Sequence, residues 1–342
     1  MIILLVLILL YFACCLASFA SQQTAKRVYV AAGVLLFIIA AFRPEGIDRD
    51  YTEYINHFNE YDFIAMLEPT FKAISWFAHT FLGSNYLFLF VVYAALGVSL
   101  KFVAIKDLSN VAILSVAIYI SQFFILHEMT QIRAGVASGF LLLCIKPLYD
   151  RDWRRFLIFA ACATAFHYSG IIIFLLWFIS KDSRLGIYKY IIPVAILIFL
   201  AGIDVVSLIP IPFISSKIEV YKNIKEHTDS VHNEINVFNS VYLVRLALCY
   251  LLFWAAPTLT KHNKYYTLLL KMYVISLAAL PLFASLPVVA YRIHELLGIV
   301  EIILIPTIVY LIKPVPVAYL AVCFYGLCQI LLSLFYNHLL EP

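Results

Sequence analysis

The sequence contains little charge. Asp, Glu, Lys and Arg make up only 13% of its 342 residues, whereas 64% are hydrophobic and the net charge is +4. A soluble domain carries about a quarter charged residues. This shortage excludes a water-soluble globular protein and indicates a chain whose main solvent is lipid. The small positive balance falls in short loops, so it predicts no nucleic-acid partner.

Metal-binding cysteine patterns are also absent. The seven cysteines form no CxxC motif and have no His/Cys spacing typical of a zinc site. All of them lie inside apolar runs, where a cysteine behaves as a small buried hydrophobic residue. The segment Met1–Leu10 lacks the basic stretch that opens a cleaved signal peptide. We therefore predict no metal site and interpret the start of the chain as its first span.

Long apolar runs dominate the sequence. A helix needs roughly 20 apolar residues to cross a bilayer, and the chain holds about eleven such runs. They cover residues 1–20, 28–42, 85–105, 111–128, 134–149, 155–180, 187–206, 240–260, 266–290, 293–312 and 315–338. Nothing between them is long enough to build a separate soluble core. We predict one all-α polytopic membrane domain over residues 1–342, with roughly 11–12 transmembrane helices.

Short basic loops predict which ends of the spans face the cytoplasm. The basic loops up to residue 155 all fall on the cytoplasmic side if the N-terminus is outside and residues 67–82 do not cross the membrane. In that segment, polar residues at helical spacing lie opposite mostly aromatic ones, which is typical of an interfacial helix. The loops at about 43–84 and 207–239 are then predicted to face outward. The basic groups assigned to the inner side include Lys26/Arg27, Lys101/Lys106 and residues 146–155.

Residues 155–180 admit two interpretations. As one helix, they would leave the basic residues that follow, such as Lys181 and Arg184, on the outer side. A break at His167–Gly170 would give one rising and one returning limb and keep these residues cytoplasmic. We prefer the broken hairpin. Its short limbs must be buried in protein or lie in a thinned bilayer.

Six ionisable side chains lie at or near the ends of apolar runs and fall on one predicted membrane face. They are Arg43, Asp48, Arg133, His167, Arg245 and Arg292. Charge is costly in or near a membrane span, so it often marks a binding site. Because most of these side chains are cationic, the group predicts an anionic ligand such as a phosphate, which arginine binds in a two-pronged contact.

Each of these residues also has a plainer interpretation. An arginine at a span end can snorkel to lipid headgroups, a lone histidine in an apolar run is more often structural, and Arg292 can pair with Glu295. Independent snorkelling would, however, distribute arginines over both faces. The grouping on one face therefore favours a shared site, with His167 or Asp48 as its base.

Short motifs in a fixed order point to a known family. They are Phe42-Arg43-Pro44, Gly46-Ile47-Asp48 with Tyr51, Glu68-Pro69-Thr70-Phe71, Gln131-Ile132-Arg133-Ala134-Gly135, Phe166-His167-Tyr168-Ser169-Gly170 and Tyr291-Arg292. With them, the chain resembles the EpsG family of polysaccharide-biosynthesis membrane proteins, Wzy-type polymerases of O-antigen, capsule or exopolysaccharide. Two departures are Gly170, where a small apolar Ala is expected, and the loop 207–239, which matches no pattern of the family.

The resemblance implies a GT-C-like glycosyltransferase of the bacterial inner membrane whose active site faces the periplasm. Undecaprenyl-diphosphate-linked oligosaccharides would be donor and acceptor, with no metal or other cofactor. Membrane lipids, a chain-length regulator and a flippase would be further partners that the resemblance implies. We assign the base to His167 or Asp48 and the leaving diphosphate to Arg133 and Arg292, supported by Arg43 and Arg245. Substrate contacts are expected from Tyr51, Tyr54, Glu68, Gln131 and Glu295.

Other functions remain as alternatives. A transporter or flippase of the same lipid-linked sugar commonly shows two related halves, and no internal repeat is visible in this chain. A membrane acyltransferase acting on polysaccharide would need a site reached by an inner acyl donor, which a one-sided cluster does not provide. A ligase that transfers finished chains is close in mechanism to a polymerase, and both interpretations stay open.

Overall fold

In the computed structural model, every regular element among the described residues is a helix. The structure describes residues 2–182, 184–206, 236–337 and 339–340. Seven of its helical segments are long and apolar enough to cross a membrane. They are Gln22–Ala41, Leu87–Leu108, Ala112–Thr130, Ile132–Asp150, Ser240–Leu259, Pro287–Tyr310 and Val315–Tyr336. The prediction of an all-α polytopic membrane protein is confirmed.

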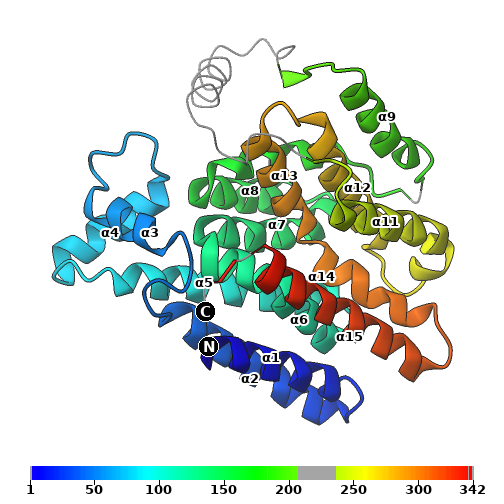
Figure 1. The fold of residues 1–342 in the computed structure, drawn as a ribbon, viewed down its shortest axis with the longest axis horizontal. Coiled ribbons are helices and arrows are strands. Elements are labelled where there is room, and N and C mark those ends of the chain that lie inside the picture. The colour runs from blue at the N-terminus through cyan, green and yellow to red at the C-terminus, as the bar shows by residue number, and fades with distance from the viewer. Residues whose placement is uncertain (1, 183, 207–235, 338, 341–342) are drawn as a thin grey trace. The chain divides into compact units, whose positions relative to one another are not determined.

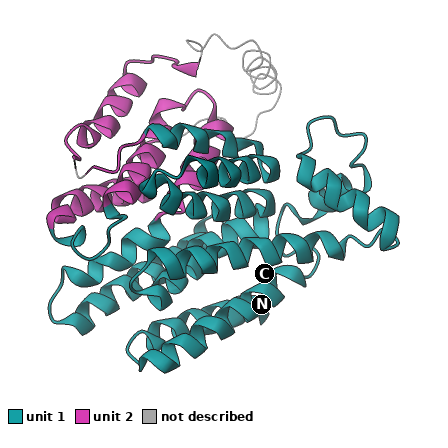
Figure 2. Cartoon of the chain, turned by 180° about the vertical axis from the view of Figure 1, so that it is seen from behind, with its two compact units in different colours: residues 1–178, 258–266, 301–342 teal, residues 179–257, 267–300 magenta. Residues whose placement is uncertain are grey.

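The chain divides into two compact units (Figure 2). Unit 1 comprises residues 1–178, 258–266 and 301–342, and unit 2 comprises residues 179–257 and 267–300. The predicted outward loop 43–84 belongs to unit 1 and is fully described. Most of the other, 207–239, lies outside the described residues. A single transmembrane domain over 1–342 stays a prediction.

Unit 1 is built around consecutive helices that alternate in direction (Figure 1). Because the connections between these helices are short, the starts of α5 and α7 lie at the same end of the bundle as the ends of η1 and α8. The α2 helix packs along α5 and ends there too. This end therefore collects Arg43, Arg133 and His167. The bounds are α2 Gln22–Ala41, α5 Leu87–Leu108, α6 Ala112–Ile118, η1 Tyr119–Thr130, α7 Ile132–Asp150 and α8 Trp153–Phe166.

Two further helices of unit 1, α3 (Tyr51–Asn59) and α4 (Pro69–Phe81), pack against that end of the bundle. Neither is among the segments that could span a membrane. On α4, Phe71 and Ser75 are buried, whereas Trp76 and Phe81 are exposed. An apolar outer face with a polar position turned inward is the pattern expected of a helix lying in the membrane interface.

The remaining described helices of unit 1 complete the bundle around α6 and η1. The α1 helix packs on α2 and α6, and α15 packs on η1, η4 and α6. Their bounds are α1 Ile2–Ala17, α14 Glu301–Leu304, η4 Ile305–Tyr310, α15 Val315–Leu331 and η5 Leu332–Tyr336.

Residues 155–180 form the broken hairpin. The α8 helix ends at Phe166, His167 is extended (φ −154°, ψ 122°), and the 3₁₀ helix η2 (Tyr168–Phe178) packs beside α8. The carbonyl of Trp177 accepts a hydrogen bond of 2.6 Å from Arg151, and its ring lies 5.1 Å from that of Phe156. Since these partners flank the start of α8, η2 runs back along it. The interpretation as one continuous span is wrong.

The 3₁₀ geometry explains how the limb with fewer residues spans the same distance as the limb with more. The α8 helix has 14 residues, whereas η2 has 11. At a rise of about 1.5 Å per α-helical residue and about 2.0 Å per 3₁₀ residue, both limbs are roughly 21–22 Å long. The hairpin therefore returns to the level at which it started, and His167 lies at its turn.

Gly170 makes this turn possible, so Gly170→Ala should destabilise the hairpin. A Cβ atom at Gly170 would lie only 2.8 Å from the backbone of Ala163 and Thr164, so the two limbs would have to separate. The expected cost is about 1–3 kcal/mol, seen as a lower Tm of the detergent-solubilised protein. Gly186→Ala is the control, because a Cβ there meets nothing within 4 Å. Equal Tm values for the two variants would contradict the prediction.

The helix η1 is a π-helix, a conformation that is rare and concentrated at functional sites. It ends where the N–H of Gln131 bonds to the carbonyl of Leu126 at 2.8 Å, and α7 begins where the N–H of Gly135 bonds to the carbonyl of Gln131 at 2.8 Å. Gln131 is thus the joint between η1 and α7. Its backbone sets the start of the helix that carries Arg133.

Two sequence predictions about the spans and their flanking residues are wrong. Lys101, grouped with Lys106 among the cytoplasmic basic residues, lies inside α5, which continues to Leu108, and its fully buried side chain pairs with Glu128 on η1. The spans predicted at 266–290 and 293–312 are instead α12 and a span from Pro287 to Tyr310. A proline is favoured at the first position of a helix, so α13 (Pro287–Gly298) begins earlier and Arg292 lies within it.

Unit 2 contains α9, α11, α12 and α13, joined by side-chain hydrogen bonds. The Tyr242 hydroxyl on α11 donates to the carbonyl of Leu277 on α12 at 3.1 Å. The Ser276 hydroxyl on α12 donates to the carbonyl of His294 on α13 at 2.7 Å. These contacts tie three helices of the unit together. The bounds are α9 Tyr188–Leu200, α11 Ser240–Leu259 and α12 Tyr266–Leu282.

Candidate functional site

Glu68 joins three segments of unit 1 at the end of the bundle described above. Its Oε2 lies 2.7 Å from Nη1 of Arg133 on α7, and its Oε1 lies 3.0 Å from Nδ1 of His167 at the end of α8. The Glu68 side chain is 4% exposed, whereas those of Arg133 and His167 are 20% and 12% exposed. A buried carboxylate is therefore covered by a guanidinium and an imidazole that still reach the surface.

The local sequence explains the position of Glu68. Pro69 is the first residue of α4, and the residue before a proline is driven out of the helical region; Glu68 accordingly has ψ 141° and its side chain does not cap the helix. Burial alone would raise the pKa of Glu68. The hydrogen bond from His167 and the charge of Arg133 outweigh it and hold the pKa at about 2. Glu68 is therefore ionised at physiological pH.

Aromatic rings enclose the guanidinium of Arg133. Its Cζ lies 5.5 Å from the ring centre of Tyr54 and 5.9 Å from that of Phe71. Tyr51 and Tyr54 are each only 4% exposed, and Tyr51 stacks on Phe90 with ring centres 4.9 Å apart. Both rings pack α3 onto the bundle in this structure, and the expected substrate contacts of Tyr51 and Tyr54 stay predictions.

Arg43 and Asp48 form a second pair at the same end of unit 1. Arg43 Nε lies 2.9 Å from Asp48 Oδ2, both side chains are at most 1% exposed, and Nη1 donates to the carbonyl of Glu128 at 2.9 Å. The guanidinium lies 4.4 Å from the ring centre of Phe90. Among the described residues, Nη2 of Arg43 is buried without a hydrogen-bond acceptor. A buried donor of this kind is costly and is suited to an anionic oxygen.

Burial raises the pKa of Asp48 to about 6, although the charge of Arg43 and the backbone N–H of Asp50 act in the opposite direction. Both carboxylate oxygens are already engaged, Oδ2 by Arg43 and Oδ1 by the N–H of Asp50 at 3.1 Å. Of the two predicted bases, His167 therefore has the more suitable surroundings, and Asp48 acts as the counter-ion that orients Arg43.

This pKa predicts a step at about pH 6 in the activity profile. Below it Asp48 is protonated and Arg43 loses its charged partner, so activity should fall. A folded-state pKa above the unfolded value makes protonation favour the fold, so Asp48 itself stabilises the fold at low pH and the loss is not unfolding driven by this group. Asp48→Asn should remove the step, whereas Glu45→Gln, at an exposed position, should keep it. A step at pH 6 in the Asp48→Asn profile would refute the assignment.

A third buried pair was not predicted from the sequence. Lys101 Nζ lies 2.5 Å from Glu128 Oε1 and donates to the carbonyl of Gly135 at 2.6 Å, with both side chains at most 1% exposed. Next to it, His127 Nδ1 lies 3.1 Å from Ser138 Oγ. The pair lies inside two spans, α5 and the segment that ends with η1. Since Glu128 also holds Arg43 through its carbonyl, this pair supports the site from within the membrane.

The predicted residues of unit 2 behave differently. Arg245 on α11 donates from Nη1 to His294 Nε2 at 2.7 Å, and His294 Nδ1 lies 3.0 Å from the carbonyl of Ser276. Nδ1 therefore carries the proton and Nε2 accepts from Arg245. Arg292 is exposed, and within the described residues it forms no ion pair, so the alternative of a pair with Glu295 is wrong. His294 was not among the predicted site residues.

The end of the unit 1 bundle can thus bind an anion and hold an imidazole in one orientation. Arg133 and Arg43 supply guanidinium groups, and Glu68 fixes His167 through Nδ1. Together with seven potential spans, these features define a polytopic helical membrane protein with a polar site of arginine–carboxylate pairs at one end of its bundle.

Comparison with known proteins assigns the family. The family model of EpsG matches residues 26–341, and the chain belongs to the EpsG family. It is also similar to the amylovoran biosynthesis protein AmsC of Erwinia amylovora, with 24% identity over 303 residues, which cover 82% of this chain and 78% of AmsC. No solved structure matches the chain.

Proposed function

We propose that the protein is a periplasm-facing glycosyltransferase of the inner membrane. In this reaction the growing oligosaccharide on undecaprenyl diphosphate is the donor, and a second lipid-linked repeat unit is the acceptor. The acceptor hydroxyl attacks the anomeric carbon of the donor, its proton passes to a base, and undecaprenyl diphosphate leaves. Membership of the EpsG family and the similarity to AmsC, a protein of amylovoran biosynthesis, support a role in polysaccharide polymerisation.

The observation that supports this chemistry best is the contact of Glu68 with His167. A carboxylate at 3.0 Å from Nδ1 favours the tautomer with the proton on Nδ1 and leaves the lone pair on Nε2. In that tautomer Nε2 can accept the proton of an acceptor hydroxyl, and the negative charge of Glu68 stabilises the imidazolium that results. His167 is therefore the proposed base, and Glu68 is the residue that positions it.

The leaving diphosphate needs cationic donors that are already in place, because interactions that strengthen as charge develops lower the barrier most. In unit 1 this task falls to Arg133, which is partly exposed, and to Arg43, whose Nη2 is buried and free of an acceptor among the described residues. Arg245 and the exposed Arg292, which belong to unit 2, stay predicted substrate contacts. Gln131 and Glu295 remain proposed substrate contacts.

Reconstitution tests the proposal directly. The purified protein in liposomes that contain the lipid-linked repeat unit, without any ion gradient, should convert single repeats into a ladder of longer chains on a gel. Arg133→Ala should leave single repeats, and Arg133→Lys should restore little, because an ammonium cannot form a two-pronged contact.

The matched control is Arg155→Ala. Arg155 pairs with Asp152 on α8, but its side chain is 74% exposed and far along α8 from His167, so the ladder should be unchanged. Movement of the lipid across the bilayer without any chain lengthening would instead favour a transporter. A full ladder from Arg133→Ala at normal protein level would remove the proposed site.

A further inference from the structure

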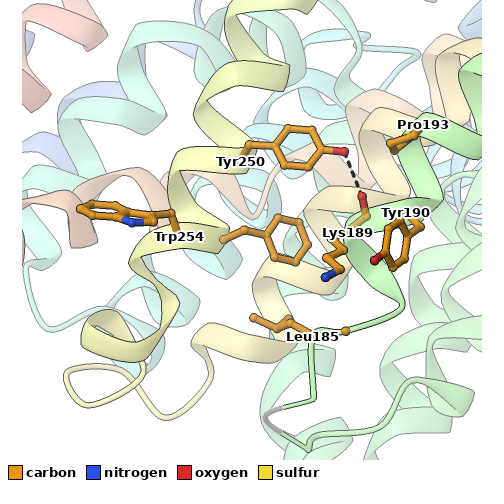
Figure 3. Close-up of a pocket in the computed structure, with 8 residues that line it drawn as sticks. Leu185, Lys189, Tyr190, Pro193, Tyr250 and Trp254 are labelled. Atoms are coloured by element: carbon orange, nitrogen blue, oxygen red, sulfur yellow. Dashed lines mark hydrogen bonds between the residues drawn. The ribbon is translucent and has the colours of Figure 1, made fainter.

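A groove of about 580 Å³ lies between α9 and α11 of unit 2 (Figure 3). Its walls are almost entirely apolar or aromatic, and among the described residues no acidic side chain lines it. The helix α11 is long and apolar enough to span a membrane, and α9 is a shorter apolar helix. The groove therefore opens on a surface that faces lipid. Its lining is Leu185, Gly186, Lys189, Tyr190, Pro193, Tyr250, Phe253 and Trp254.

Hydrogen bonding fixes the two walls of the groove. The hydroxyl of Tyr250 on α11 donates to the carbonyl of Lys189 in the first turn of α9 at 3.0 Å (Figure 3). Trp254, one turn further along α11, is 78% exposed, and Tyr190 on the opposite wall is 57% exposed. Large rings exposed on both rims of a lipid-facing hollow favour an apolar chain as its occupant.

Lys189 gives the groove a single positive charge. Its side chain extends from α9 into the space between the two helices (Figure 3), and Nζ lies 4.8 Å from the ring centre of Tyr190. Lys181 and Arg184 precede it in the chain and are also exposed. Short basic segments face the cytoplasm, whose leaflet is rich in anionic lipids. The charge of the groove therefore complements the headgroups expected around it.

We infer that this groove binds one anionic phospholipid. The phosphodiester contacts Nζ of Lys189, and one acyl chain lies along Pro193, Phe253 and Trp254. A single lysine matches the single negative charge of a phosphodiester better than the charge of a diphosphate. The inference does not depend on the proposed glycosyltransferase activity.

Trp254 provides the probe for a test, because bromine in an acyl chain quenches a tryptophan that it touches. The purified protein is placed in vesicles of phosphatidylcholine and phosphatidylglycerol. Two preparations are compared. In one, a small fraction of the phosphatidylcholine carries bromine, and in the other the same amount of phosphatidylglycerol carries it. The share of fluorescence due to Trp254 is the difference between the native protein and Trp254→Phe. Brominated phosphatidylglycerol should quench this share with an apparent affinity about fivefold higher than that of brominated phosphatidylcholine. This is the effect expected of one basic group near an anionic headgroup.

Lys189→Gln should abolish the preference for phosphatidylglycerol while leaving quenching by both lipids. Lys26→Gln, which removes an exposed lysine near the start of α2, should keep the preference and is the matched control. Equal quenching by the two lipids in the native protein would overturn the inference, as would a preference that survives in Lys189→Gln. Displacement of the brominated phosphatidylglycerol by added polyprenyl phosphate at lower concentration would also overturn it, because the groove would then be a polyprenyl site.

Discussion

Glu68→Gln should lower the rate of chain elongation by about a thousandfold or more, while the protein remains in the membrane at its normal level. The amide keeps the shape of the side chain but removes the charge between Arg133 and His167. The amide also no longer enforces the histidine tautomer with a lone pair on Nε2. Replacing the carboxylate of a carboxylate–histidine pair by an amide is known to lower the reaction rate by at least this factor. The measurement is the initial rate of ladder formation in liposomes.

Glu60→Gln provides the control for this variant. Glu60 is an exposed carboxylate at the end of α3, close in sequence to Glu68 but without a described contact to the site. Its elongation rate should equal that of the native protein. Normal elongation by Glu68→Gln would show that the buried carboxylate serves only packing. A monodisperse profile of Glu68→Gln in detergent is needed to separate lost chemistry from lost folding.

Lys101→Met should produce the largest loss of stability. It leaves Glu128 buried inside three packed helices without its cation, and breaking a buried ion pair from one side costs about 3–5 kcal/mol. The amount of protein in the membrane fraction and its Tm in detergent should both fall sharply. Glu128→Met should have a similar effect, because it leaves the ammonium of Lys101 unpaired.

The double variant Lys101→Met/Glu128→Met distinguishes the cost of an unpaired charge from a simple packing defect. Replacing both members of a buried pair by apolar side chains of similar size is often neutral or stabilising. The Tm should therefore return to at least the native value. If the double variant is as unstable as the sum of the two single variants, the two side chains do not interact and the proposed pair is wrong.

The apolar frame of the protein could be predicted from the sequence, because the cost of exposing backbone groups to lipid leaves few arrangements. The positions of most spans, a helix within 67–82 that is not among the candidate spans, and the break at His167 all follow from hydropathy and from the distribution of lysine and arginine. Span ends were less well predicted. They depend on local backbone chemistry, as at Pro287, and on partners remote in sequence, as for Lys101.

The candidate site was predicted only in outline. Arg43 with Asp48, and Arg133 with His167, do meet at one end of unit 1, as expected from their position at span ends. The pairing itself could not be predicted, because it depends on side-chain positions: Glu68 was expected to contact substrate, yet it bridges Arg133 and His167. Gly170, an apparent departure from the family pattern, is explained by the close approach of its two helical limbs.

A signal for Glu128 was nevertheless present in the sequence. His127-Glu128 and Lys101 are ionisable residues inside two successive apolar runs, and opposite charges within neighbouring spans usually pair. Counting Lys101 among the cytoplasmic basic residues concealed this relation. The burial of Tyr51 and Tyr54 could not be predicted either, since an aromatic residue in a loop can be exposed or fill a core, and its burial here depends on the packing of α3.

The burial of Arg43 and Asp48 has a consequence for the behaviour of the protein in salt. At physiological ionic strength the Debye length is about 8 Å, so mobile ions weaken attractions between exposed charges but hardly reach buried ones. The pair Arg155–Asp152, whose side chains are 74% and 37% exposed, should be screened as sodium chloride is added. The pair at Arg43 should keep its strength, so the geometry of this end of the bundle should tolerate changes in ionic strength.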